Sequence, residues 1–130
     1  MDTNVLTSAL AARGLCAELL EAVIQQHELL IGPPLVAELE RVLMTKLGLP
    51  KDIVAAFIAL LDEQANSHDA SVSFDHPQVD DDDKIIVATA LSARADIFVT
   101  GDKALLRTVS LGGMPILSPR EAWRRLAAVP

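Results

Sequence analysis

Apolar residues recur at helical spacing in three long stretches of the chain. Leu15–Gln26 carries apolar residues three or four positions apart, with glutamates between them, which predicts an amphipathic helix. Pro33–Leu43 predicts a second helix, because proline is tolerated in a first helical turn. A third helix is predicted from about Lys51 to Gln64, after a break at Gly48 and Pro50.

Short apolar or β-branched runs separate these predicted helices. Each run is bounded by turn residues and is too short for a helix, which favours a strand. The runs are Met1–Leu6, in which a strand is expected to end in a turn, His27–Ile31, a loop followed by a short strand within Asn66–Phe74, Ile97–Thr100 and Met114–Leu117.

Two more helices follow from local signals. The apolar run Ile85–Leu91 comes after four aspartates and predicts a buried helix through Ala93 rather than a strand. Ser118–Glu121 has the form of a capping box, which predicts the start of a closing helix. Strands that alternate with helices predict a single α/β domain over residues 1–130, a three-layer α/β/α arrangement with a mostly parallel central sheet.

Composition narrows the class of protein. The chain has 130 residues, 51% of them hydrophobic, which is enough for a folded core. The single cysteine, Cys16, excludes a disulfide scaffold and a multi-cysteine zinc site. No apolar run approaches the roughly 20 residues of a membrane span, so no membrane association and a cytoplasmic location are expected.

The charge balance is acidic but uneven. Eleven basic and 18 acidic residues give a net charge of −7, which argues against binding nucleic acid by bulk charge alone. Four of the acids stand together at positions 80–83. Such a run is more often a solvated loop, but a cation-binding centre would also concentrate negative charge.

Four carboxylates from distant positions are expected to meet at one edge of the sheet. In α/β folds, ligands bind at the carboxyl ends of the strands. Asp2 lies at or just past the first predicted strand and Asp102 directly follows a later one, whereas Asp83 lies at the start of a predicted helix and Glu38 one turn into another. Like charges at close range repel unless a cation neutralises them, and Mg²⁺ or Mn²⁺ prefers oxygen ligands.

Four short motifs, in order along the chain, resemble the PIN-domain family. The resemblance is closest to the toxins of bacterial type II toxin–antitoxin pairs, similar to VapC, and it covers nearly the whole chain. The segment Ile116–Glu121 is also similar to the end of that branch. The four motifs are Asp2–Leu6, Leu35–Leu39, Asp80–Ala90 and Val99–Lys103.

The resemblance implies a metal-dependent endoribonuclease, a hydrolase that cleaves RNA phosphodiesters with one or two Mg²⁺ or Mn²⁺ ions. Position by position, it implies that the catalytic and metal-binding acids are Asp2, Glu38, Asp83 and Asp102. Asp80 is a further candidate metal ligand, and Glu40 is the alternative to Glu38. Asn4 and Thr100 match positions that support the acids or the metal-bound water through hydrogen bonds.

The expected partners are an RNA substrate, a cognate antitoxin protein and a second copy of the chain in a homodimer. Candidate RNA-binding residues are Lys84, Arg94, Lys103 and Arg107. The predicted helix from Lys51 to Leu61 has more apolar surface than one face can bury. We therefore expect it to contact the second copy or the antitoxin.

The chain departs from the family pattern at its start. Members usually carry several apolar residues before the first motif, whereas only Met1 precedes Asp2 here. The first strand is therefore expected to be truncated, or the natural chain to begin earlier. This leaves an alternative, a catalytically weak PIN-like module that binds RNA or protein. A receiver-like signalling domain is a third reading, but the last strand lacks the lysine that such domains carry.

Overall fold

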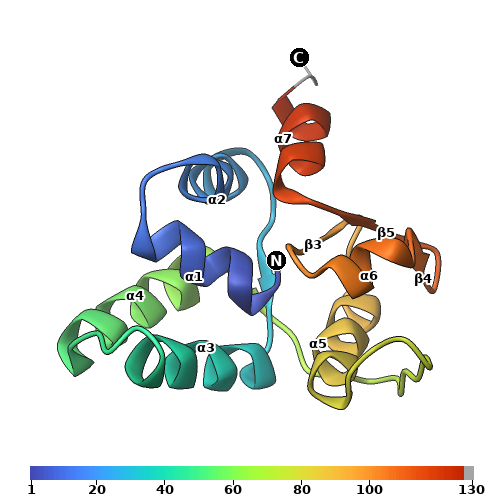
Figure 1. The fold of residues 1–130 in the computed structure, drawn as a ribbon, viewed down its shortest axis with the longest axis horizontal. Coiled ribbons are helices and arrows are strands. Elements are labelled where there is room, and N and C mark those ends of the chain that lie inside the picture. Colours follow the sequence, from blue (N-terminus) through green and yellow to red (C-terminus); the bar gives the residue numbers. More distant parts are fainter. Residues whose placement is uncertain (128–130) are drawn as a thin grey trace.

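Helices make up most of the structure, a computed structural model that describes residues 1–127 (Figure 1). The helices are α1 Thr3–Ala11, α2 Leu15–Gln26, α3 Pro33–Thr45, α4 Lys51–Gln64, α5 Asp81–Ser92, α6 Lys103–Arg107 and α7 Pro119–Ala127. No helix among the described residues is long and apolar enough to cross a membrane.

Five short strands form two separate sheets. In the first sheet, β1 (Leu30–Ile31) pairs in parallel with β2 (Asn66–Ser67). In the second, β3 (Phe98–Val99) pairs in parallel with β5 (Met114–Leu117), and β4 (Ser110–Leu111) pairs antiparallel with β5. The α/β class is therefore confirmed, but the strands of the described residues do not join into one continuous sheet.

Several predicted elements match the structure closely. The bounds of α2, α4 and β5 are those predicted, and α5 ends one residue before the predicted Ala93. The capping box is formed, because the Ser118 N–H donates to the Glu121 carboxylate (3.1 Å) and the Glu121 N–H donates to Ser118 Oγ (3.2 Å). These bonds satisfy backbone groups that would otherwise be unpaired at the start of α7.

Two local predictions were wrong, and two short elements were missed. The first run was expected to be a strand ending in a turn, but helix α1 already begins at Thr3. Within residues 66–74 the strand comes first and the loop follows. The short elements α6 and β4 were not predicted at all, because five and two residues are too few to show a period.

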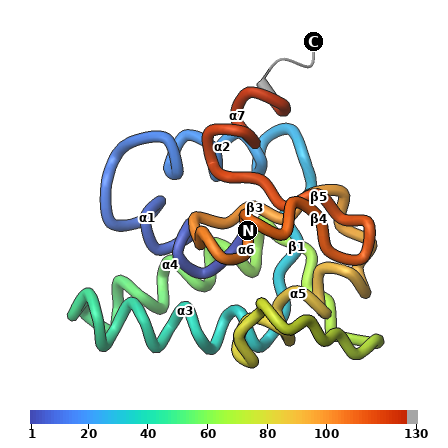
Figure 2. Tube along the Cα trace, turned by 45° about the vertical axis from the view of Figure 1, so that its right-hand side comes forward, coloured from blue at the N-terminus to red at the C-terminus, as the bar shows by residue number. Residues whose placement is uncertain are grey.

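The N-terminus lies in the middle of the molecule, beside β3, in both views of the chain (Figures 1 and 2). Asp2 is extended (φ −71°, ψ 158°), and its backbone N–H donates to the Val99 carbonyl (2.8 Å). The same residue caps α1. Residue 2 therefore both ends an extended segment next to β3 and begins a helix.

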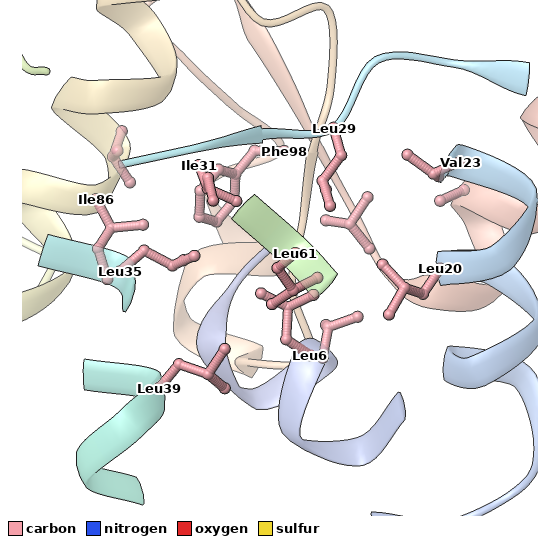
Figure 3. Packing of buried hydrophobic residues seen from close by; sticks show 14 of the residues in the cluster. Leu6, Leu20, Val23, Leu29, Ile31, Leu35, Leu39, Leu61, Ile86 and Phe98 are labelled. Carbon is pink, nitrogen blue, oxygen red and sulfur yellow. The ribbon is translucent and has the colours of Figure 1, made fainter. Parts of the chain in front are cut away.

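One hydrophobic core connects the helices to both sheets (Figure 3). Leu6 of α1, Leu19 of α2 and Leu39 of α3 are completely buried in it. Ile31 and Phe98 bring the two sheets into the same cluster. Each fully buried side chain of this size contributes on the order of 2 kcal/mol, so the core fixes the helices that carry the acids.

Gly32 joins β1 to α3 at a point of close approach. A Cβ atom at this position would lie 2.5 Å from the His68 carbonyl oxygen and 2.7 Å from Cγ2 of Thr89 in α5. Glycine is therefore required here by lack of space, and the start of α3 packs tightly against α5.

Candidate active site

Asp2 is a buried carboxylate, 4% exposed, that links the start of the chain to the end of β3. Its Oδ1 accepts a hydrogen bond from the Thr3 N–H (2.7 Å), and its Oδ2 accepts one from the Thr100 hydroxyl (2.7 Å). Thr100 is fully buried. Both carboxylate oxygens are thus fixed in direction by groups 1 and 98 positions away.

The Thr100 hydroxyl also connects Asp2 to Asp102. It accepts a hydrogen bond from the Asp102 N–H (3.0 Å) while it donates to Asp2. The Asp102 side chain caps α6, where it accepts from the N–H groups of Ala104 (2.8 Å) and Leu105 (3.4 Å). Thr100, predicted as a supporting residue, therefore organises two of the four predicted acids.

Glu38 and Asp83 face the same region from α3 and α5. Burial, the Asp2 charge and the Asp82 charge raise the pKa of Glu38. Burial raises the pKa of Asp83 to about 6, with further contributions from the charges of Asp2, Glu38, Asp102 and Asp80. A negative charge raises the pKa of another carboxylate only over a short distance. The acids of these four segments therefore lie close enough together to repel one another.

Thr3 is a polar residue at this site that the sequence reasoning missed. It is 1% exposed, and its hydroxyl has no hydrogen-bond partner of normal geometry among the described residues. It lies beside Glu38, where it counters part of the rise in the pKa of that carboxylate. A buried hydroxyl without a partner is unfavourable by roughly 1–3 kcal/mol, which is typical of a place that takes a further polar group.

The remaining predicted site residues, Asp80, Asn4 and Glu40, are all exposed. Asp80 is exposed and occupies the cap position of α5 without a side-chain hydrogen bond. Asn4 is exposed on α1, and no hydrogen bond joins its side chain to the acids in the described part of the chain. Glu40 is exposed, two residues from the half-buried Glu38, which favours Glu38 of the two.

The four predicted RNA-binding residues do not form one group. Lys84 is held by two carboxylates, Asp75 (2.7 Å) and Asp81 (2.9 Å), and these raise its pKa to about 12. Lys103 and Arg107 are exposed on α6, directly after Asp102. Arg94 follows the opposite end of α5, about 16 Å of helix away from Asp83.

The donor set suits a hard divalent cation, although the cage is open. All candidate ligands are carboxylate oxygens, and the unpaired Thr3 hydroxyl adds a neutral oxygen beside them. Nowhere in residues 1–127 are three or more Asp, Glu, His or Cys side chains close enough together to enclose a metal ion. The residues therefore fit such an ion in type, with side-chain rotations needed to close around it.

Asp2 is buried next to the end of β3, and Glu38, Asp83 and Asp102 are partly buried in or just before α3, α5 and α6. Carboxylates gathered in this way are typical of metal-dependent nucleic-acid hydrolases. The family model of the PIN domain matches residues 1–104, which is most of the chain. The chain belongs to the PIN-domain family, and PIN domains are generally nucleases. This finding removes the receiver-like reading.

Comparison with curated proteins gave no match, and comparison with solved structures gave none either.

Proposed function

We propose that this PIN domain is a metal-dependent endoribonuclease and the toxin component of a toxin–antitoxin pair acting in the cytoplasm. The observation that carries the proposal is the Thr100 hydroxyl, which bonds Asp2 and the backbone of Asp102 while Glu38 and Asp83 share their field. A fold gains nothing from gathering unpaired acids, so the arrangement favours a cationic ligand.

In this proposal Asp2, Glu38, Asp83 and Asp102 hold Mg²⁺ or Mn²⁺, with Asp80 able to turn in from its exposed position. When bound, the ion supplies activation of a water molecule and stabilisation of charge on the leaving oxygen. Thr100 keeps the Asp2 carboxylate aimed at the site. The proposal keeps the predicted three-layer arrangement, in which the acids would lie at the carboxyl edge of a mostly parallel sheet.

Lys103 and Arg107 are the best placed of the basic residues to contact the RNA backbone. Both are exposed on α6, whose first residue follows Asp102 directly. Lys84 contributes only if RNA phosphates displace Asp75 and Asp81 from its ammonium group. Arg94 lies at the other end of α5 and is proposed only for a more distant part of the RNA.

Exposed apolar side chains at the far end of α3 and on α4 support the proposed contacts with an antitoxin or with a second copy. Met44 and Leu47 lie at the end of α3, and Ile53 and Leu60 lie on one side of α4. Their exposed fractions, from 37% to 47%, are high for residues of this type.

The second candidate function is a catalytically weak module that binds RNA or protein. The open cage favours it, because in residues 1–127 no three acids stand within reach of one ion. The two candidates differ in metal-dependent cleavage, which the first requires and the second lacks.

The deciding experiment is cleavage of structured RNA in Mn²⁺, Mg²⁺ or EDTA by the wild-type chain and by Asp102→Asn. We expect cleavage that requires metal and falls at least about 100-fold in the variant, because a group that binds the ion directly is lost. The matched control is Asp62→Asn, an exposed aspartate in the last turns of α4, just before β2 begins. Cleavage that survives both EDTA and Asp102→Asn would contradict the proposal.

A further inference from the structure

The positive charge of the chain is concentrated in α6 and α7. Between Lys103 and Arg125 there are five basic residues and one acid, Glu121, so this segment has a charge of +4. Residues 1–102 hold six basic and 17 acidic residues and have a charge of −11. A basic segment in an acidic chain is typical of a surface that binds an anionic partner.

Both helices begin at the edge of the sheet where the acids lie. β3 and β5 are parallel neighbours, and where they end the Thr100 N–H donates to the Leu117 carbonyl (2.9 Å). α6 follows one strand and α7 the other, and both helices contact β5 (Figure 1). Adjacent strands lie about 4.8 Å apart. Lys103 and Arg120, each within four residues of a strand end, therefore begin at the same edge as Asp102.

The buried and the basic residues of α7 lie on opposite faces. Ala122 is fully buried, and Trp123 packs against the core. Arg120, Arg124 and Arg125 are exposed. At about 100° per residue, these arginines span a sector of roughly 140° on the side of the helix away from Ala122. They therefore form one exposed basic surface.

The three arginines are not neutralised by neighbouring acids in the described part of the chain. The ion pairs found within residues 1–127 are those of Lys84. Glu121 is the acid next to the arginines in sequence, but its carboxylate accepts a hydrogen bond from the Ser118 N–H (3.1 Å). The guanidinium groups of α7 are consequently available to an anionic ligand.

The helix dipole accounts for two of these arginines but not for the third. Arg124 and Arg125 lie in the last turn of α7, where a positive charge stabilises a helix. Arg120 lies in the first turn, where a positive charge is unfavourable. It is also four residues from Arg124, a spacing at which like charges repel. The stability of α7 therefore does not explain Arg120, whereas an anionic ligand does.

The arrangement suits the backbone of a nucleic acid better than a single small anion. A guanidinium group binds phosphate through two parallel hydrogen bonds. The basic residues begin beside Asp102 and continue along the exposed face of α7, so that successive phosphates have successive partners. On the α2 side of α7, Glu18 and Glu21 line a groove next to Trp123 and would repel phosphates. The outer face of α7 is thus the side that fits RNA.

We propose that α6 and α7 bind the RNA backbone through a surface here named the basic rim: Lys103, Arg107, Arg120, Arg124 and Arg125. Arg120 binds a phosphate close to the one that is cleaved, and Arg124 and Arg125 bind phosphates further along the strand. This proposal rests on the proposed RNA substrate, and it adds three residues of α7 to the two of α6.

The test measures the binding of a fluorescein-labelled RNA hairpin in EDTA, at NaCl concentrations from about 50 to 200 mM. Fluorescence anisotropy compares the wild-type chain with Arg120→Gln/Arg124→Gln/Arg125→Gln. In the variant we expect the affinity at the lowest salt concentration to fall at least about tenfold. The slope of log affinity against log salt concentration should decrease by about 2, because three phosphate contacts are lost.

The matched control is Arg13→Gln/Lys46→Gln/Lys51→Gln, which removes the same charge from three exposed residues outside the basic rim. Its affinity should fall less than about threefold, and its salt slope should stay the same, because no phosphate contact is lost. Lysine at the three arginine positions of α7 should preserve the slope, because the positive charges remain. Equal losses in the two glutamine variants would overturn the proposal, because net charge alone would then govern binding.

The wild-type chain provides a measurement that does not depend on the stability of a variant. NMR signals of the arginine Nε–Hε groups are followed in EDTA during titration with the hairpin and, separately, with polyglutamate. The signals of Arg120, Arg124 and Arg125 should shift with RNA, whereas that of Arg13 should not. Unshifted α7 signals would overturn the proposal. Equal shifts with polyglutamate would also overturn it, because the basic rim would then bind acidic protein as well as RNA.

Failure of the nuclease proposal is distinguishable from failure of this one. If RNA binds the basic rim but is not cleaved in Mn²⁺, the nuclease proposal is wrong and the rim is supported. If RNA is cleaved, but binds the α7 glutamine variant as tightly as the wild type, the rim is wrong and the nuclease proposal stands. If the wild-type chain binds no RNA, the rim is wrong as well.

Discussion

The four central acids of the site form two pairs that differ in how they are held. Asp2 and Asp102, the bonded pair, are fixed through Thr100 and through backbone N–H groups. Glu38 and Asp83, the unbonded pair, make no hydrogen bond of normal geometry within the described residues, and their pKa values are raised. Folding alone thus positions one pair, whereas the other is left with repulsion that a cation would relieve.

The largest expected effect comes from breaking the bonded pair with Thr100→Val. The variant keeps the shape of the side chain but leaves the Asp2 carboxylate and the Asp102 N–H without their partner. We expect the free energy of unfolding to fall by about 2–3 kcal/mol in denaturant titrations. Thr45→Val is the matched control, since that exposed hydroxyl bonds only the Arg41 carbonyl, and its effect should stay within about 0.5 kcal/mol.

The second effect is stabilisation by a divalent cation, which acts mainly on the unbonded pair. At pH 7, Mn²⁺ at tenfold over its Kd should raise the free energy of unfolding by about 1.4 kcal/mol. Thermal unfolding measures this rise. It should be lost in the double variant Glu38→Gln/Asp83→Asn and kept in Asp62→Asn, and an equal rise in the double variant would show that the ion binds elsewhere.

The third effect is a pH-dependent gain in stability in Asp83→Asn. The folded protein holds the Asp83 proton more tightly than the unfolded chain, because the pKa is raised from 3.8 to about 6. Stability is therefore lost as the pH rises from about 4 to 6 and stays lower above that. The variant should gain about 1 kcal/mol at pH 7, after allowance for partial exposure, and nothing near pH 3.5.

The control for this pH effect is Asp82→Asn, which changes an exposed neighbour in the same helical turn. Its stability relative to wild type should vary little between the two pH values. A gain in Asp83→Asn that is the same at both would mean that the carboxylate is not repelled by the other acids.

The smallest effect sharpens the contrast between the two threonines. Thr3→Val removes a buried hydroxyl whose missing hydrogen bond is unfavourable, so the free energy of unfolding should rise by up to about 1 kcal/mol. The pKa of Glu38 should rise, because the neighbouring hydroxyl no longer stabilises its charge. NMR titration of the Glu38 carboxyl carbon measures this, and an unchanged pKa would remove Thr3 from the site.

Helices were predictable from the sequence where one face is buried over several turns. The bounds of α2 and α4 agree with the prediction at both ends, because buried leucine, valine and phenylalanine residues recur along these helices at helical spacing. α1 was not predicted, because Asp2 is both the last extended residue of the first segment and the cap of α1. The sequence pattern indicated the extended residue and not the helix that follows it. Strand pairing was not predictable, since two-residue strands carry no register signal.

The candidate site was predictable in its acids and less so in their surroundings. Asp2, Asp83 and Asp102 could be selected because each lies at or next to the start of a helix, and Glu38 because the resemblance to the PIN-domain family marks its position. The ion pair between Lys84 and Asp75 could not be predicted, because the path of the loop that carries Asp75 is set by packing rather than by the local sequence pattern. The unpaired hydroxyl of Thr3 likewise depends on the exact position of α3.

Gly32 has no side chain, and this allows the helices that carry Glu38 and Asp83 to lie close together. Glu38 lies on the helix that starts after Gly32, and Asp83 lies on the helix whose Thr89 touches that glycine. One added methyl group would push these helices apart and lengthen the gap that an ion must bridge. The geometry of a charged site thus depends on an uncharged contact, between a backbone without a Cβ atom and the methyl group of a threonine.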